Sequence, residues 1–307
     1  MKNLFSVILL FLLFVNGLFS QELQIFKVED FDLKGKVKSC LVITDYGREL
    51  FQFDEEGRLV STVTQYNESD QDITYYKYEE GELVEKRMES YKDNILDVTT
   101  SMVNFFTVDT TAQRRVSEKI ISYDKEFLEQ QTYEYDNQER LMKITSSNAD
   151  GVDDITLSYE TNKDEETCSY FFNGIIEKSI RTSEKKSNTT KTKIVLTKEF
   201  VDGEPNKAVE EVFEGEGALV SRESFTYDLQ KKRFASDKKM FYSYDTNGML
   251  TKEVTQTSNS KSMKEYIYQF DDSLDKNWVR QIVTPGNSYT SRKIEYYPQE
   301  KTEDVPN

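Results

Sequence analysis

The chain of 307 residues contains no histidine. Histidine is the general base of Ser-His-Asp and Cys-His catalysis and the commonest zinc ligand. Its absence excludes both catalytic arrangements and disfavours a zinc centre. The glycine-rich stretch Gly215-Glu216-Gly217 belongs to a hairpin turn and has no following helix to hold a phosphate. We therefore expect a non-enzymatic protein with no catalytic, cofactor-binding or metal-binding residues.

Cysteine is nearly absent, and the two residues present are Cys40 and Cys168. They could form a disulfide in an oxidising compartment. However, 128 positions separate them, and the sequence does not show that they meet. Both have apolar or aromatic neighbours, so two separate buried thiols are at least as good an interpretation.

Long apolar runs are absent beyond the first twenty residues. Residues 1–20 have a short basic start, an apolar stretch from Leu4 to Val15 and a polar break, which is the layout of a secretory signal peptide. The alternative is an uncleaved anchor, but the stretch is shorter than the roughly 18 apolar residues that span a bilayer. We predict export to the periplasm or the outside of the cell, with no membrane span after signal cleavage.

Basic residues are too few for a surface that binds nucleic acid. The 56 acidic residues outnumber the 40 basic ones, and the net charge is −16. This excess disfavours nucleic acids and anionic membranes as partners. It is typical of a surface that keeps an exposed β-protein soluble. The partner we expect is a protein or a glycan whose identity the sequence does not give.

Aromatic residues are plentiful, with 19 Tyr and 19 Phe, and they recur in a pattern. The pattern is aromatic-x-aromatic-acid, then a turn and a leucine, and adjacent copies are 25 or 26 residues apart. A fixed period of this size indicates a repeat architecture. The clear copies are 51–59, 76–83, 133–141 and 242–250, and the weaker ones are 212–219 and 268–278.

Each copy predicts a β-hairpin. Aromatic residues at i and i+2 face the same side of a strand, the acid opens and caps the turn, and a later glycine takes the left-handed position. The loop lengths then set the register. They predict Gly57 and Gly248 at left-handed positions and four cross-strand pairs: Phe53–Leu59, Tyr78–Leu83, Phe213–Leu219 and Tyr244–Leu250.

The other segments are rich in β-branched residues and show no sustained helical period. We predict an all-β fold in which antiparallel hairpin repeats form a long twisted sheet or a short β-roll or solenoid. The expected domains are a signal peptide at 1–20, a repeat domain at 21–297 and a loose polar tail at 298–307. Polar sequence marks an interruption at 180–210, which we interpret as a break within one sheet rather than a domain boundary.

The Tyr-x-Tyr-Asp-x-x-Gly-x-Leu units resemble YD (Rhs-type) repeats. The opening residues 33–39 and the closing residues 277–278 and 294–297 resemble those of small exported repeat proteins common in Bacteroidota. In large Rhs-type toxins the resemblance implies a β-shell around a toxic cargo. This chain is far shorter and shows no cargo domain, so we expect an open sheet or short roll rather than a closed shell.

Some acidic and aromatic residues could carry chemistry. The turn acids could form a row that binds calcium, but turn capping explains them better. A second acidic group around Gly151 lacks the ligand spacing of a calcium loop. Paired carboxylates could make a glycosidase, although 56 acids provide such pairs by chance. The two acidic groups are Asp54, Asp136, Asp245 and Asp271, and Asp150, Asp153 and Asp154.

The aromatics could form a face that binds sugar or peptide, but the core of a half-buried sheet accounts for them. Trp278, the single tryptophan, is expected to plug the last repeat. Together these inferences favour an exported, non-enzymatic β-repeat protein that serves as a binding or structural module in the cell envelope. Two alternatives stay open. One is a carbohydrate-active enzyme or accessory subunit with paired carboxylates. The other is a carrier or immunity partner of a toxin, which rests on the resemblance alone.

Overall fold

The computed structural model describes residues 25–186, 191–215 and 217–298. The predicted signal peptide lies outside these residues, and so does the predicted tail apart from Pro298. The described elements are one 3-10 helix and 21 strands: η2 (Val28–Phe31), β1 (Val37–Thr44), β2 (Gly47–Phe53), β3 (Leu59–Gln65), β4 (Gln71–Glu79), β5 (Glu82–Lys92), β6 (Ile95–Leu96), β7 (Met102–Asp109), β8 (Arg115–Ser122), β9 (Phe127–Tyr135), β10 (Leu141–Asn148), β11 (Val152–Asn162), β12 (Glu165–Phe172), β13 (Ile175–Lys186), β14 (Lys191–Val201), β15 (Glu204–Glu214), β16 (Ala218–Asp228), β17 (Arg233–Tyr244), β18 (Leu250–Thr257), β19 (Lys261–Phe270), β20 (Trp278–Thr284) and β21 (Ser288–Tyr296).

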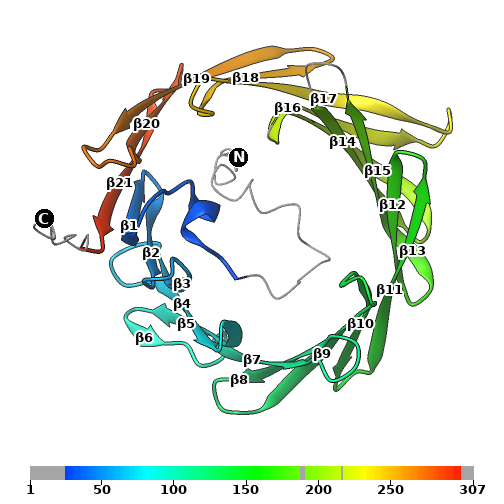
Figure 1. Cartoon of the computed structure of the whole chain (residues 1–307), viewed down its shortest axis with the longest axis horizontal. Coiled ribbons are helices and arrows are strands. Elements are labelled where there is room, and N and C mark those ends of the chain that lie inside the picture. Colours follow the sequence, from blue (N-terminus) through cyan, green and yellow to red (C-terminus); the bar gives the residue numbers. More distant parts are fainter. Residues whose placement is uncertain (1–24, 187–190, 216, 299–307) are drawn as a thin grey trace, which may run out of the picture.

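The strands form one antiparallel sheet that closes on itself (Figure 1). Neighbours in sequence pair with each other, and β1 also pairs with β21, which joins the two ends of the sheet. The short strand β6 pairs with β5 alone, while β5 continues the sheet to β7. The result is a closed β-barrel of 20 strands.

Closure corrects part of the sequence prediction. The all-β fold and its antiparallel hairpins are confirmed, whereas the open sheet, short roll or solenoid is wrong. The physical reason is that hairpins joined edge to edge leave two free edges, whose unpaired N–H and C=O groups need partners. Pairing β1 with β21 removes both edges at once. Within the predicted interruption, β14 and β15 pair with each other and with their neighbours.

The register defines an inner and an outer face. The helix η2 lies inside the barrel (Figure 1), and its Val28 packs in one buried cluster with Cys40 and Val42 of β1. These two residues therefore point inward. Their cross-strand partners, and every second residue from those partners, point inward too. When the pairings are followed around all 20 strands, the same assignment is reached again at β1. There Cys40 lies opposite Ile294 of β21, a partly buried residue that packs against the same cluster.

The barrel is wide relative to its height, since Figure 1 looks down its shortest axis. Strands lie about 4.8 Å apart, so 20 of them give a backbone diameter of at least about 30 Å. Side chains do not fill barrels with so many strands. The inward-facing Lys193, Lys207 and Lys238 are accordingly exposed to water. No helix in the described part of the chain is long and apolar enough to cross a membrane.

The hairpin turns match the sequence prediction. All four predicted cross-strand pairs are present, each beside a β-bulge. Gly57 and Gly248 have φ angles of 80° and 79°. The first acid of each of these turns caps it, because Asp54 Oδ1 accepts the backbone N–H of Arg58 at 2.8 Å and Asp245 Oδ1 accepts that of Met249 at 2.9 Å.

Tyrosine hydroxyls join neighbouring hairpins. Tyr78 donates to the carbonyl of Leu59 at 2.7 Å, and Tyr244 donates to that of Leu219 at 2.8 Å. The accepting residue is in each case the leucine that ends the preceding turn. The guanidinium of Arg58 also lies over the Tyr78 ring, 5.0 Å from its centroid. The second aromatic of these repeats therefore points inward and joins its own hairpin to the preceding one, which explains its recurrence in the sequence.

One turn has a non-glycine residue at the left-handed position. Glu139, with φ of 61°, stands where Gly57 and Gly248 stand in the other copies. We expect Glu139→Gly to raise the unfolding free energy by roughly 0.5–1 kcal/mol, because the left-handed backbone strains a residue with a Cβ. Urea unfolding measures the change. Gly248→Ala is the control, since nothing lies within 4 Å of its added Cβ and only backbone strain should destabilise it. A less stable Glu139→Gly variant would contradict the strain argument.

Candidate binding surface on the inner wall

A segment of the chain itself occupies part of the inner wall. The ring of Phe31 lies 4.7 Å from that of Phe51 and 5.4 Å from that of Phe53, measured between centroids. Leu33 is 1% exposed in the same cluster. Backbone bonds continue the contact, since the N–H of Val28 donates to the carbonyl of Gly57 at 2.9 Å. This part of the wall, formed by β1 to β4 and β21, therefore binds an apolar polypeptide segment through side chains and backbone together.

The same segment is fastened where β21 meets β1. The buried amide of Asn277 accepts the N–H of Lys34 and donates to its carbonyl, both at 2.8 Å. Arg292 donates to the carbonyl of Phe31 at 3.0 Å, and its guanidinium lies 3.4 Å from the centroid of the Trp278 ring. Burial lowers the pKa of Arg292. Residues from both ends of the chain thus hold the barrel closed.

Elsewhere the inner wall buries carboxylates against hydrogen-bond donors. Glu118 is 5% exposed and accepts hydrogen bonds from Asn104 Nδ2 at 2.5 Å and from the Tyr133 hydroxyl at 2.9 Å. Burial, and then the Glu118 charge, raise the pKa of Tyr133, so this phenol stays neutral at ordinary pH. On β18 and β19, Glu253 accepts from Tyr266 at 3.4 Å. These buried glutamates were not predicted from the sequence, because only acids in turns and around Gly151 were considered as candidates.

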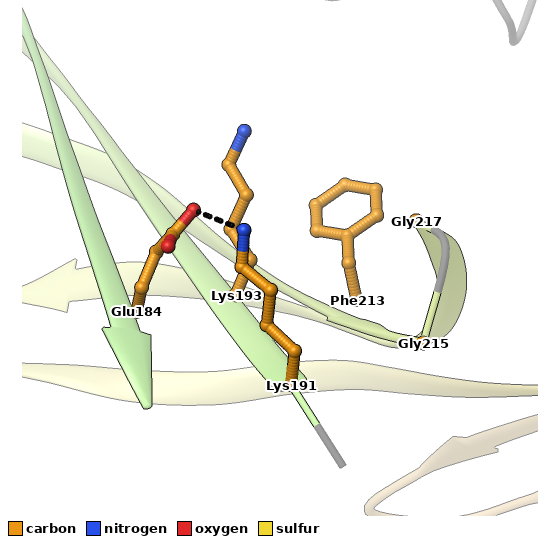
Figure 2. Close-up of a pocket in the computed structure, with 6 residues that line it drawn as sticks. All are labelled: Glu184, Lys191, Lys193, Phe213, Gly215 and Gly217. Atoms are coloured by element: carbon orange, nitrogen blue, oxygen red, sulfur yellow. Dashed lines mark ion pairs between the residues drawn. The ribbon is translucent and has the colours of Figure 1, made fainter. Parts of the chain in front are cut away.

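A cavity of about 480 Å³ opens on the inner wall at one end of β13 to β15 (Figure 2). Lys191 and Glu184 form an ion pair of 3.0 Å on one side of it. Figure 2 shows the Phe213 ring on the other side, with the Lys193 side chain extended between them. The cavity therefore offers an aromatic surface next to an ammonium group that forms no ion pair with any described residue.

A second cavity, of about 710 Å³, lies beside the closure of the barrel. It includes Asp272, Asp275, Tyr296 and Tyr297. Neither this cavity nor the first brings together two acids and three aromatic residues, the arrangement that a carbohydrate-active site would favour.

The turn acids bond to their own turns rather than to one another. Asp136 Oδ1 accepts the N–H of Arg140 at 3.0 Å, and Asp271 accepts the hydroxyls of Ser273 and Tyr296. Capping by Asp54, Asp136 and Asp245 is therefore confirmed. Among the described residues, no group of three or more Asp, Glu or Cys side chains could hold a metal ion.

The acids around Gly151 do not converge either. Asp153 points inward and accepts a hydrogen bond from Asn173 Nδ2 at 2.8 Å. Its neighbour Asp154 points outward and forms an ion pair of 3.0 Å with Lys143. Adjacent residues of a strand point to opposite faces, so these two carboxylates cannot share one ion.

Both cysteines are free thiols. Cys40 lies on β1 and Cys168 on β12, ten strands away in either direction around the barrel. Burial raises the pKa of the Cys40 thiol to about 11, an effect that the nearby Arg292 only partly offsets. Two separate thiols are thus what the structure shows. Trp278, expected as a plug, is 6% exposed and points into the barrel beside Arg292.

The fold and this wall define a class: a closed antiparallel β-barrel with a wide interior that holds a segment of its own chain. No family model and no curated protein sequence matches the chain. Among solved structures, a protein of unknown function from Bacteroides fragilis is similar at 13% identity and a TM-score of 0.14, over 71% of this chain and 95% of that one. A porin-like protein from Bacteroides vulgatus is similar at 10% identity and a TM-score of 0.24, over 86% and 99%. Likenesses this weak support no conclusion about function.

Proposed function

We propose that the protein is an exported, non-enzymatic binding module of the cell envelope whose inner wall holds a polypeptide segment of a partner. The observation that carries the proposal is the segment from Phe26 to Leu33, which the wall already binds within the same chain. A wall that buries Phe31 and Leu33 and pairs with the backbone near Val28 has the elements of peptide recognition, namely apolar pockets and main-chain hydrogen bonds.

The outer face supports a barrel surrounded by water. Almost every strand has a charged residue at an outward position, and these residues are spread around the whole circumference. Each Lys or Arg facing lipid near the middle of a bilayer would cost about 2–4 kcal/mol. An aqueous compartment of the envelope, rather than the bilayer, therefore fits this surface. The outward charges include Arg48, Lys77, Arg87, Lys119, Glu134, Lys143, Asp154, Arg181, Lys198, Glu210, Glu223, Lys239, Lys252, Glu265, Arg280 and Lys293.

Peptide complementation tests the binding function. The double variant Phe31→Ala, Leu33→Ala should weaken the hold of the wall on its own segment and lower the melting temperature. A synthetic peptide of residues 25–36 should then restore several degrees of thermal stability, because a ligand that binds only the folded state stabilises it. Wild-type protein is one control, and a peptide with both residues changed to alanine is the other. Equal shifts with both peptides, or none with either, would contradict peptide binding by the wall.

Export is tested separately on the native host. We expect protein from the envelope or the culture medium to begin at about Gln21, because residues 1–20 have the layout of a cleaved signal peptide. N-terminal sequencing of the fractionated protein gives the answer. A protein that begins at Met1 and stays in the cytoplasmic fraction would contradict the export part of the proposal and leave the binding part standing.

A further inference from the structure

Charges on the inner wall are divided into two arcs. From β1 to β12 the inward positions of the paired registers hold six acids and two bases. These are Glu49, Asp72, Glu118, Glu129, Asp153, Glu166, Lys86 and Lys92. From β13 to β21 the inward side chains that the structure describes include nine bases and six acids. These are Lys178, Lys191, Lys193, Lys207, Arg222, Arg233, Lys238, Lys264, Arg292, Glu184, Glu199, Glu204, Glu211, Asp228 and Glu253.

Several of the inward bases are matched by acids. Lys191 pairs with Glu184 at 3.0 Å, and weaker pairs at 3.7 Å join Arg222 to Glu211 and Lys264 to Glu253. Three lysines are different. Lys193, Lys207 and Lys238 are exposed to water and form no ion pair with any residue that the structure describes. We call these three residues the lysine arc.

The distance between two residues of the lysine arc matches the length of a short extended polypeptide. Phe213 lies opposite Lys193 on β15, and Lys207 is six residues further along that strand. At about 3.3 Å per residue, Lys193 and Lys207 are therefore about 20 Å apart along the strands. An extended polypeptide of about six or seven residues covers that distance. Between the two lysines the inward positions include the small residues Val195, Thr197, Val209 and Ser224. They also include Glu211, which forms an ion pair of 3.7 Å with Arg222, and Glu199 lies opposite Lys207 on the neighbouring strand.

The negative net charge of the whole chain does not cancel this local field. At physiological salt, charges more than about 8 Å apart are largely screened. A ligand beside the lysine arc is therefore attracted mainly by these lysines. The inward acids of β1 to β12, on the other side of the barrel, disfavour a negatively charged ligand on their own side. The cavity beside Lys193 adds the Phe213 ring at one end of the arc, where an apolar side chain would fit (Figure 2).

We propose that the lysine arc binds an acidic polypeptide segment in an extended conformation inside the barrel. This rests on the proposed function and names the chemistry of its ligand. A polypeptide is favoured over an acidic glycan because the occupant that the wall already holds is a polypeptide segment.

Charge reversal on the two faces of the same sheet tests the proposal. The inner variant is Lys193→Glu, Lys207→Glu, Lys238→Glu. The matched outer variant is Lys198→Glu, Lys252→Glu, Lys261→Glu, which makes the same change of charge at outward positions of β14, β18 and β19. Binding of fluorescent poly-L-glutamate is measured by anisotropy at 50 and 300 mM NaCl. Poly-L-lysine and polygalacturonate are the comparison polymers.

Wild-type protein should bind polyglutamate, more weakly at high salt, and the inner variant should bind it at least tenfold more weakly. The outer variant should stay within about twofold of wild type. If the inner variant misfolds by circular dichroism, the corresponding Lys→Gln variant takes its place. No binding by wild-type protein, equal loss in both variants, or tighter binding of polygalacturonate would overturn the proposal. The complementation experiment with the 25–36 peptide involves none of these lysines, so each idea can fail without the other.

Discussion

Trp278→Ala is expected to lower the unfolding free energy by about 3–5 kcal/mol, the usual loss for a large buried aromatic. Trp278 is 6% exposed, and its ring lies 6.0 Å from that of Tyr268 in an edge-on arrangement. The substitution also leaves the buried Arg292 without the ring that it faces at 3.4 Å. Because Arg292 holds the carbonyl of Phe31, the loss should spread to the N-terminal segment.

Tyr289→Ala is the matched control. Tyr289 is an aromatic residue of the neighbouring strand β21, but it points outward and is 53% exposed. Its removal should change stability by no more than about 0.5 kcal/mol. Urea unfolding followed by far-UV circular dichroism suits both variants, since Trp278 is the only tryptophan. Equal losses in the two variants would show that Trp278 has no special place in closing the barrel.

Local features of this fold could be predicted from the sequence because they depend on neighbouring residues. The pair Phe53–Leu59 and the left-handed Gly57 follow from a turn of five residues, and the structure confirms both. The predicted pair Tyr78–Leu83 is likewise present, and the two residues of the loop between β4 and β5, Glu80 and Gly81, both have positive φ. Hairpin geometry is a short-range property, so the repeat pattern contains enough information to define it.

Closure could not be predicted because it depends on contacts across the whole chain. Cys40 of β1 lies opposite Ile294 of β21, and Asn277 bonds to Lys34 over a separation of 243 positions. No repeat unit encodes these pairings. Twenty strands close only if the twist and stagger of every hairpin add up to a full turn, and a period of 25 or 26 residues does not determine that sum.

The residues that form the inner wall could not be predicted from the sequence either. An alternating pattern assigns the faces of a strand only while the alternation continues, and the bulge beside each predicted pair breaks it. Lys193 and Lys198 lie on the same strand, yet only the register shows that Lys193 points inward and Lys198 outward. Charges that look evenly spread in the sequence are thus sorted by the fold into an acidic and a basic arc.

Glu118→Ala is the second substitution with a large expected effect, about 2–4 kcal/mol of lost stability at pH 7. Glu118 accepts hydrogen bonds from Asn104 and Tyr133. Its removal leaves the buried Asn104 amide without this acceptor, while the Tyr133 hydroxyl loses a charged acceptor and keeps Gln131 Oε1 at 2.6 Å. The raised pKa of Tyr133 keeps its phenol protonated at pH 7, as it is in the unfolded chain. A measurement at that pH therefore reports on the lost hydrogen bonds and not on a change of charge at the tyrosine.

Two further variants make this test specific to the buried interaction. Glu118→Gln keeps one acceptor oxygen and should recover at least half of the loss. Glu134→Ala removes an outward carboxylate of β9 that forms an exposed ion pair with Arg115, and it should cost less than about 1 kcal/mol. If Glu118→Ala and Glu134→Ala proved equally mild in urea unfolding, the inner wall would not depend on its buried carboxylates. The large loss expected for Glu118→Ala alone would show that the wall is a fixed surface, as the recognition of a partner segment requires.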